Sequence, residues 1–177
     1  MDKYRKVKII GEGSFGKALL VTDKGSGQQF VMKEIPLNKM TPKKRADASK
    51  EIVVLAQMNH PNIVRFRESF EENDYLFIVM NFCEKGDLYN TIWSQPREFP
   101  EDQVMDWFVQ ISHAIKYIHD RRILHRDIKT KNIFLTSSGA AQLGDFGISK
   151  VLGSMEFTRI YWKSVLLVSR NISGETI

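Results

Sequence analysis

Short apolar runs separated by turns make up the first third of the chain. Val7 and Ile9 lead into a glycine-rich segment at 11–16, the apolar run 18–21 follows, and a second glycine turn precedes the run 30–32. Runs this short, broken by glycine, are typical of an antiparallel sheet. The pattern therefore predicts three consecutive strands at the start of the fold.

A helix is predicted after these strands, because Thr41 suits an N-cap and Pro42 suits the first helical position. Apolar residues keep helical spacing up to the segment 59–61, whose proline ends the helix. Two further strands are predicted at 64–70 and 76–82, joined by a polar turn. Five strands and one helix would thus form the first half of the chain.

The second half begins with a change to helical periodicity. Pro100 and two acidic residues suit a helix start, and the apolar positions that follow recur every 3.6 residues. They are Val104, Trp107, Phe108, Ile111, Ile115 and Ile118. This pattern predicts a long amphipathic helix from Glu101 to Arg121, which needs a partner layer for its apolar face. The segment Asn81–Asp87, in which Gly86 and Asp87 suit a turn and a helix cap, is the predicted boundary between two lobes.

Composition narrows the class of protein. The 177 residues allow one compact domain, and 42% hydrophobic with 27% charged residues describes a chain that can bury a core. A balance of 26 Lys and Arg against 21 Asp and Glu gives +5, with the basic residues scattered, so we expect no nucleic-acid partner. A single cysteine, Cys83, fits a reducing compartment, and no stretch resembles a leader or a membrane span. We expect a soluble cytoplasmic or nuclear protein.

Glycines at 11, 13 and 16 fit the G-x-G-x-x-G spacing, which lets backbone N–H groups approach a polyphosphate. The same spacing opens Rossmann folds and also occurs in simple tight turns. Here a strand-like segment, 17–22, follows the glycines in place of a helix, which favours a hairpin over a nucleotide. Lys33, in the third strand, is either a surface lysine or a phosphate ligand. Glu51, 18 residues later on the predicted helix, can pair with it.

Two polar segments of the second half suit phosphoryl transfer. The segment His125–Asn132 supplies the carboxylate of Asp127, the ammonium of Lys129 and the amide of Asn132 directly after the long helix. Such a loop can orient a hydroxyl, neutralise phosphate charge and bind Mg²⁺, although it can also be merely solvated. Asp145, followed by Phe146 and Gly147, offers a second oxygen ligand suited to Mg²⁺.

In this order and spacing, the sequence resembles the eukaryotic protein kinases and, among them, the NIMA-related serine/threonine kinases. The resemblance covers residues 4–159. It is carried by Gly11–Gly16, Lys33, Glu51, His60–Val64, Phe77–Met80, Gly86–Leu88, His125–Asn132 and Gly144–Gly147. It implies an α+β fold, with a five-stranded antiparallel sheet and a helix in an N-lobe (4–80), a hinge (81–87) and an incomplete, mainly helical C-lobe (88–159).

The resemblance also implies the role of each matched residue in transfer of the ATP γ-phosphate to Ser or Thr. Asp127 and Lys129 would be catalytic, and Asn132 and Asp145 would hold Mg²⁺. The ATP-binding set would be Ile10, Gly11, Glu12, Gly13, Ser14, Phe15, Gly16, Ala18, Lys33, Glu51, Met80, Asn81, Phe82 and Cys83. Met80 and Cys83 are interpreted first as packing residues.

The resemblance ends near Arg159. We interpret residues 160–177 as a divergent tail after a truncation within the activation segment, which leaves a second hypothesis open. In that alternative the chain is an inactive kinase product that acts as an ATP-binding or regulatory interaction module. The long helix would then expose its face at Trp107, Phe108 and Ile111, and a partner or chaperone would cover it. The family resemblance adds nuclear, centrosomal or ciliary locations to the cytoplasmic one and gives no reason to expect a membrane partner.

Overall fold

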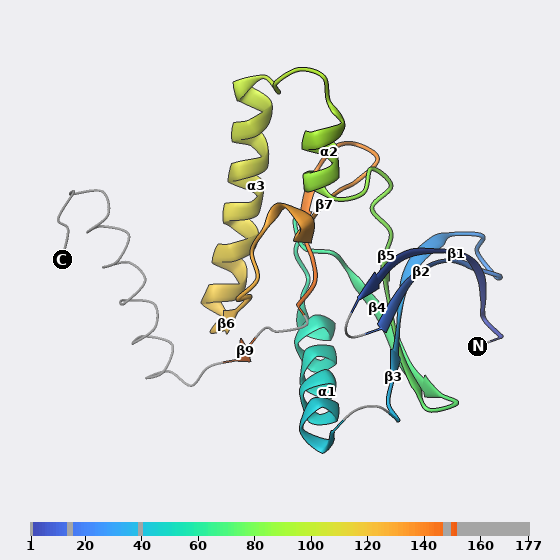
Figure 1. Ribbon diagram of the computed structural model, residues 1–177. Helices are drawn as coiled ribbons and strands as arrows, with labels where there is room; N and C mark the ends of the chain where they lie inside the picture. The colour runs from blue at the N-terminus through green and yellow to red at the C-terminus, as the bar shows by residue number, and fades with distance from the viewer. Residues whose placement is uncertain (1, 14–15, 39–40, 147–149, 152–177) are drawn as a thin grey trace.

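The computed structural model describes residues 2–13, 16–38, 41–146 and 150–151, and every structural statement below concerns these residues. Its first half is a five-stranded antiparallel sheet with one helix (Figure 1). The strands follow the order β1-β2-β3-β5-β4. Their bounds are β1 Tyr4–Gly13, β2 Gly16–Asp23, β3 Gln29–Pro36, β4 Phe66–Glu72 and β5 Tyr75–Asn81, and α1 spans Pro42–Gln57. The predicted five strands and helix are confirmed.

The two faces of the sheet bury different residues because side chains alternate along each strand. Phe30 and Met32 of β3 belong to a small core cluster on one face. Ile35 faces the other way, into the large cluster that includes α1 and the second half of the chain. Lys33 shares the face of Ile35 and therefore points toward the second half of the molecule.

In the described part of the second half there are two α-helices, one 3-10 helix and short paired strands. These are α2 Leu88–Ser94, α3 Glu101–Asp120, β6 Ile123–Leu124, the 3-10 helix η1 Thr130–Asn132, β7 Ile133–Leu135, β8 Ala141–Leu143 and β9 Lys150–Val151. Strands β7 and β8 form a hairpin, and β6 pairs with β9. The helix predicted at 101–121 is confirmed. Among the described residues, no helix is long and apolar enough to cross a membrane.

The segment 82–87, which lies within the predicted lobe boundary at 81–87, links β5 to α2. Gly86 has a φ of +73°, which favours glycine, and Asp87 caps α2 by accepting a hydrogen bond from the backbone N–H of Asn90 at 2.8 Å. The backbone N–H of Lys85 donates to the carbonyl of Leu135, so the β7–β8 hairpin holds this segment.

The expectation that α3 exposes its face at Trp107, Phe108 and Ile111 is wrong for two of the three residues. Trp107 and Ile111 are buried, at 8% and 7% exposure, and the Trp107 indole donates a 3.0 Å hydrogen bond to the carbonyl of Gly139 in the β7–β8 turn. Phe108 is 65% exposed. The β7–β8 hairpin packs on Trp107 and Ile111, because the apolar side chains of its own strands must also be buried.

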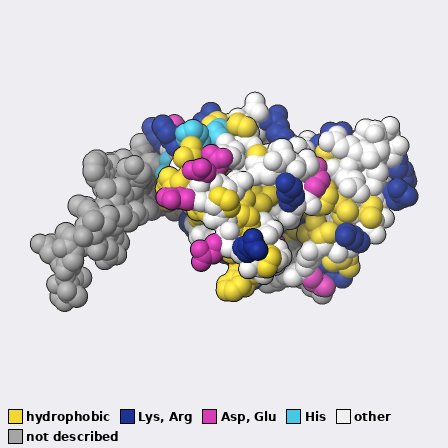
Figure 2. Space-filling view, turned by 90° about the horizontal axis from the view of Figure 1, so that it is seen from above, with side chains coloured by type: hydrophobic (Ala, Val, Ile, Leu, Met, Phe, Trp, Pro, Cys, Tyr) yellow, Lys and Arg dark blue, Asp and Glu magenta, His cyan; other side chains and the backbone are white. Residues whose placement is uncertain are grey.

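Phe108 lines a groove of about 700 Å³ between α2 and α3, together with Ile92, Trp93 and Val104. These four side chains are all exposed, and Trp93 is 74% exposed. Figure 2 shows the molecule from above, with hydrophobic side chains gathered between scattered charged ones. Among the described residues, several exposed apolar side chains thus gather where α2 and the start of α3 meet.

Candidate functional site

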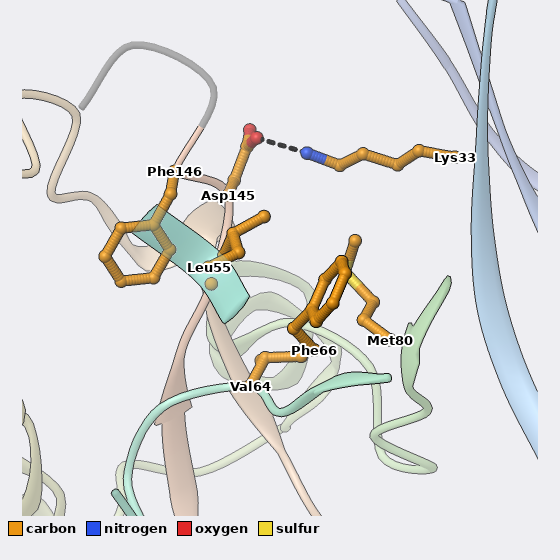
Figure 3. A pocket seen from close by; sticks show the side chains of 8 residues that line it. Lys33, Leu55, Val64, Phe66, Met80, Asp145 and Phe146 are labelled. Carbon is orange, nitrogen blue, oxygen red and sulfur yellow. Dashed lines mark hydrogen bonds and ion pairs between the residues drawn. The ribbon is translucent and has the colours of Figure 1, made fainter. Parts of the chain in front are cut away.

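Lys33 and Asp145 meet although 112 residues separate them in sequence. The Lys33 ammonium lies 2.7 Å from Oδ1 of Asp145, as the dashed line in Figure 3 shows. Lys33 comes from β3, and Asp145 comes from the segment directly after β8. The sheet and the second half of the chain therefore bring a cation and a carboxylate together at their junction.

Apolar side chains close the space behind this ion pair. Leu55, Val64, Phe66, Met80 and Phe146 line a cavity of about 10 Å³, which has room for no more than one water molecule. Phe146 is buried at 1% exposure. The ion pair therefore has an apolar wall on one side, which weakens solvent screening and strengthens its Coulomb attraction.

The pKa of Asp145 reflects these surroundings. Burial would raise the pKa of this carboxyl, but the charge and hydrogen bond of Lys33 outweigh burial and bring the pKa below its ordinary value. Asp145 is consequently an ionised carboxylate at neutral pH, which is the form that binds a metal cation.

The catalytic loop predicted at 125–132 forms a compact polar cluster. The Lys129 ammonium lies 2.6 Å from Oδ2 of Asp127, and the Asn132 side-chain N–H groups donate to Oδ2 and to the backbone carbonyl of Asp127 at 2.9 and 2.8 Å. The hydrogen bond from Lys129 and then the one from Asn132 lower the pKa of Asp127. The side chains of Lys129 and Asn132 therefore both contact the carboxylate of Asp127.

Asn132 also connects this loop to Asp145. Its backbone carbonyl accepts a 2.9 Å hydrogen bond from the N–H of Gly144, the residue before Asp145. The side-chain nitrogen of Asn132 donates to Asp127, so the amide oxygen is the atom of this side chain that could bind a metal. An amide oxygen and an ionised carboxylate are the oxygen donors that Mg²⁺ prefers, so this pair fits the expected metal. Within the described ranges, no cluster of three or more His, Cys, Asp or Glu side chains offers another metal site.

His125 makes contacts in this loop that its place in the motif did not indicate. Its side chain is buried at 1% exposure, its Nε2 lies 2.8 Å from the carbonyl of Gly144, and its Nδ1 accepts a 3.3 Å hydrogen bond from the N–H of Asp127. The ring also contacts that of Phe146, with centroids 4.7 Å apart. His125 thus links Asp127 to the segment that carries Asp145. The sequence signal was its place beside Asp127 within the loop.

Two residues at this site have left-handed backbone conformations without being glycine. Arg126 has a φ of 67° and Asp145 a φ of 58°. Such conformations cost about 1–3 kcal/mol each and persist where the surrounding structure imposes them, which is common at functional sites. In this chain they lie directly beside Asp127 and at the predicted metal ligand itself.

The glycine hairpin is formed by β1 and β2, and only part of it is described. Ser14 and Phe15 lie outside the described residues. Ala18 lies opposite Gly11 on one side and Lys33 on the other, so the hairpin is in register with the lysine. Glu12 forms an ion pair with Lys17 at 3.3 Å, and Ile10 is exposed.

Gly16 is required for a reason that the motif does not reveal. Its φ is +135°, and a Cβ atom at this position would lie 2.1 Å from the backbone carbonyl oxygen of Glu34. A Cβ at Gly11 would meet only the Cβ of Ala18, at an ordinary 3.7 Å. The third glycine of the motif therefore permits β2 to lie close against β3, whereas the position of the first glycine has room for a Cβ atom.

The remaining predicted ATP-binding residues lie along β5 and the segment after it. Met80 is half-buried in the large core cluster, and Asn81 ends β5 with its N–H donating to the carbonyl of Arg65 at 2.9 Å. Phe82 is half-buried, while Cys83 is buried and its thiol contacts Oε1 of Gln142 at 3.4 Å. Burial raises the pKa of Cys83 to about 11, so its thiol is a neutral packing group.

The predicted partner of Lys33, Glu51, lies on α1, but its side chain falls outside the described residues, as does the backbone of Gly147. The predicted Lys33–Glu51 pair remains a prediction. Within the described residues, the predicted site residues form two groups in contact: Lys33 with Asp145, and Asp127 with Lys129 and Asn132. The bond between Asn132 and Gly144 joins the two groups.

Comparisons with known proteins also support the resemblance to protein kinases. The protein kinase domain family matches residues 4–169. The chain is 56% identical over 155 residues to serine/threonine-protein kinase Nek1 of Mus musculus, covering 87% of this chain and 13% of that protein. It is 51% identical over 163 residues to serine/threonine-protein kinase Nek3 of Mus musculus, and the match covers 91% of this chain and 31% of that protein. It is 52% identical over 162 residues to serine/threonine-protein kinase Nek5 of Homo sapiens, and the match covers 90% of this chain and 23% of that protein. The chain thus spans less than a third of the length of these relatives.

Proposed function

The chain belongs to the protein kinase family, in its NIMA-related serine/threonine group, and on that premise we propose that it binds ATP with Mg²⁺ and transfers the γ-phosphate to Ser and Thr hydroxyls of protein substrates. The observation that carries the proposal is the contact of Lys33 with Asp145 at 2.7 Å, tied to the catalytic loop through Gly144. In this contact the ammonium that would bind phosphate lies beside the carboxylate that would bind Mg²⁺.

The proposed roles follow from the charges of these residues. Lys33 would bind the α- and β-phosphates, because β3 directs its ammonium toward Asp145 and away from the outer face of the sheet. Asn132 and Asp145 would hold Mg²⁺, which neutralises charge on the phosphates when it is bound. The ionised carboxylate of Asp127 would orient the substrate hydroxyl and accept its proton, while Lys129 would stabilise negative charge at the γ-phosphate.

The adenine would bind at the segment 81–83, where backbone groups follow the end of β5. Ile10 and Ala18 would cover the ring from the glycine hairpin, and Met80 would bound the space behind it. The Cys83 side chain is turned into the core toward Gln142, so only its backbone is suited to contact a nucleotide. Glu12, Ser14 and Phe15 belong to the hairpin that would cover the phosphates.

A paired measurement tests this function. The full chain is purified with an Asp127→Asn variant, and both are assayed for stabilisation by Mg·ATP and for phosphate transfer to a generic Ser/Thr substrate. We expect both proteins to be stabilised, and we expect the substitution to lower kcat by about 10²–10⁴-fold, since it removes the proton acceptor. Equal transfer by the two proteins would contradict the role of Asp127.

The groove between α2 and α3 favours a second candidate function, a regulatory interaction module that binds ATP without transferring phosphate. Its lining is mainly apolar, with Gln95, Arg97 and Glu98 as its polar members. A partner protein that presents an amphipathic helix fits such a groove. Stabilisation by Mg·ATP with no transfer by the wild-type chain would support the module over the enzyme.

A further inference from the structure

One side chain of α3, Gln110, joins three segments that are distant in sequence. Its Oε1 accepts a 2.7 Å hydrogen bond from the backbone N–H of Ala141 and a 3.3 Å hydrogen bond from the side-chain nitrogen of Asn62. The same nitrogen of Asn62 donates to the carbonyl of Ala141 at 3.0 Å. Gln110, Asn62 and Ala141 thus form a closed triangle of hydrogen bonds between α3, the α1–β4 connection and β8.

The triangle lies at the start of the strand that leads to the metal-binding carboxylate. Ala141 is the first residue of β8 and has 0% exposure, and Asp145 follows it by four residues. Beyond the triangle, the backbone N–H of Leu143 donates to the carbonyl of Asn62 at 2.8 Å, and that of Val64 donates to the carbonyl of Leu143 at 2.9 Å. The α1–β4 connection therefore runs alongside β8 up to the residue before Gly144.

Gln110 is the only member of the triangle that belongs to neither of the two segments that run side by side. It anchors both of them to α3, a 20-residue helix whose Ala114 and Ile118 are fully buried. A rigid helix is a better reference for position than two short extended segments, since its own hydrogen bonds fix its backbone. This acceptor oxygen therefore contributes to the position of β8 along α3, together with the hydrogen bond from Trp107 to Gly139.

We propose that Gln110 is a positioning residue for phosphoryl transfer, which acts by holding β8 and Asn62 on α3 so that Asp145 lies opposite Lys33. The proposal rests on the function proposed above. It concerns a residue that lies outside the predicted ATP-binding, metal-binding and catalytic sets. Misplacement of a reacting group by about 1 Å can cost about 10²-fold in rate, so loss of this anchor should be measurable.

Three variants of the full chain test this role. Gln110→Met keeps the length of the side chain and removes the acceptor, whereas Gln110→Glu keeps acceptor oxygens in the same place. Trp107→Phe is the matched control, because it removes a hydrogen bond from α3 to the same hairpin at Gly139, two residues before Ala141. We expect Gln110→Met to lower kcat at least tenfold with an unchanged KM for the peptide substrate, and the other two to stay within threefold of wild type.

A similar loss of kcat in Gln110→Met and Trp107→Phe, or in Gln110→Met and Gln110→Glu, would overturn the proposal, because either result would indicate general loosening of the hairpin. If the wild-type chain transfers no phosphate, the proposed function fails, and amide hydrogen exchange decides the role of Gln110. Faster exchange over residues 141–146 in Gln110→Met than in Trp107→Phe would support the anchor, and equal exchange would refute it.

Discussion

Replacing Gly16 by alanine tests whether the glycine hairpin is held by close packing on β3. The added Cβ would lie 2.1 Å from the Glu34 carbonyl oxygen, 3.1 Å from its carbonyl carbon and 3.2 Å from the Cα of Ile35. All three neighbours are backbone atoms, so no side-chain rotation relieves the clash. The strand pairing of Lys17 with Glu34 must open instead.

The cost of this change has two parts. A non-glycine residue in the sparsely populated backbone region of Gly16, φ +135°, costs about 1–3 kcal/mol. Loss of one strand hydrogen bond adds about 1 kcal/mol. The sum, about 2–4 kcal/mol, corresponds to a fall in Tm of about 4–16 °C for a chain of this size. Because Glu34 adjoins Lys33, we also expect weaker binding of Mg·ATP.

Gly11→Ala is the matched control, since the added Cβ has ordinary contact distances there. This variant should keep the wild-type Tm or raise it slightly, because replacing a strand glycine gains about 0.5–1 kcal/mol. Thermal unfolding of wild type and both variants is followed by circular dichroism without nucleotide. Equal Tm values for Gly16→Ala and Gly11→Ala would refute the packing argument.

Three further predictions concern buried and exposed side chains. Burial lowers the pKa of His125, so the unfolded chain binds more protons than the folded chain between that pKa and about 6.5. The free energy of unfolding, measured with urea, should therefore fall as the pH drops below about 6.5. It should fall less steeply in His125→Gln. Ile118→Ala should cost about 2–5 kcal/mol by the same assay, whereas Phe108→Ser should cost less than about 0.5 kcal/mol. Cys83 should resist alkylation at pH 8 until the protein is unfolded, as mass spectrometry would show.

Local patterns in the sequence were sufficient to predict most of the elements. Glycine turns, the Thr41–Pro42 helix start and the apolar period of α3 all act within a few residues, so each element could be predicted separately. The β4–β5 turn shows the limit of this approach. The polar residues at 71–74 predicted the turn, but the turn consists only of Asn73 and Asp74, which both have a positive φ. Strand β4 therefore extends to Glu72 and β5 begins at Tyr75.

Features that depend on distant segments could not be predicted in the same way. The burial of Trp107 and Ile111 comes from the β7–β8 hairpin, whose strands are only three residues long and give little periodic signal. The need for glycine at Gly16 arises from the backbone of β3, and the role of Gln110 arises from β8 and Asn62. Each is a contact across the fold that no spacing along the chain encodes.

The order of the motifs predicted a set of site residues, whose roles stay predictions, but it did not predict the contacts among them. The sequence suggested Glu51 as a partner of Lys33, and this pair stays a prediction because the side chain of Glu51 lies outside the described residues; the contact of Lys33 with Asp145 was not predicted. His125 stood inside the motif and was overlooked, because its role depends on the carbonyl of Gly144 and the ring of Phe146. Both contacts form only when the catalytic loop and the segment after β8 come together.

Analysis of phosphorylated amino acids tests the central claim most directly. The full chain is incubated with Mg²⁺, γ-labelled ATP and a peptide mixture that contains Ser, Thr and Tyr, beside the Asp127→Asn variant, and the labelled peptide is hydrolysed. We predict label on phosphoserine and phosphothreonine in the wild-type reaction, none on phosphotyrosine, and no label with the variant. Label on tyrosine, or transfer that is equal in the Asp127→Asn variant, would contradict a serine/threonine kinase that works through Asp127.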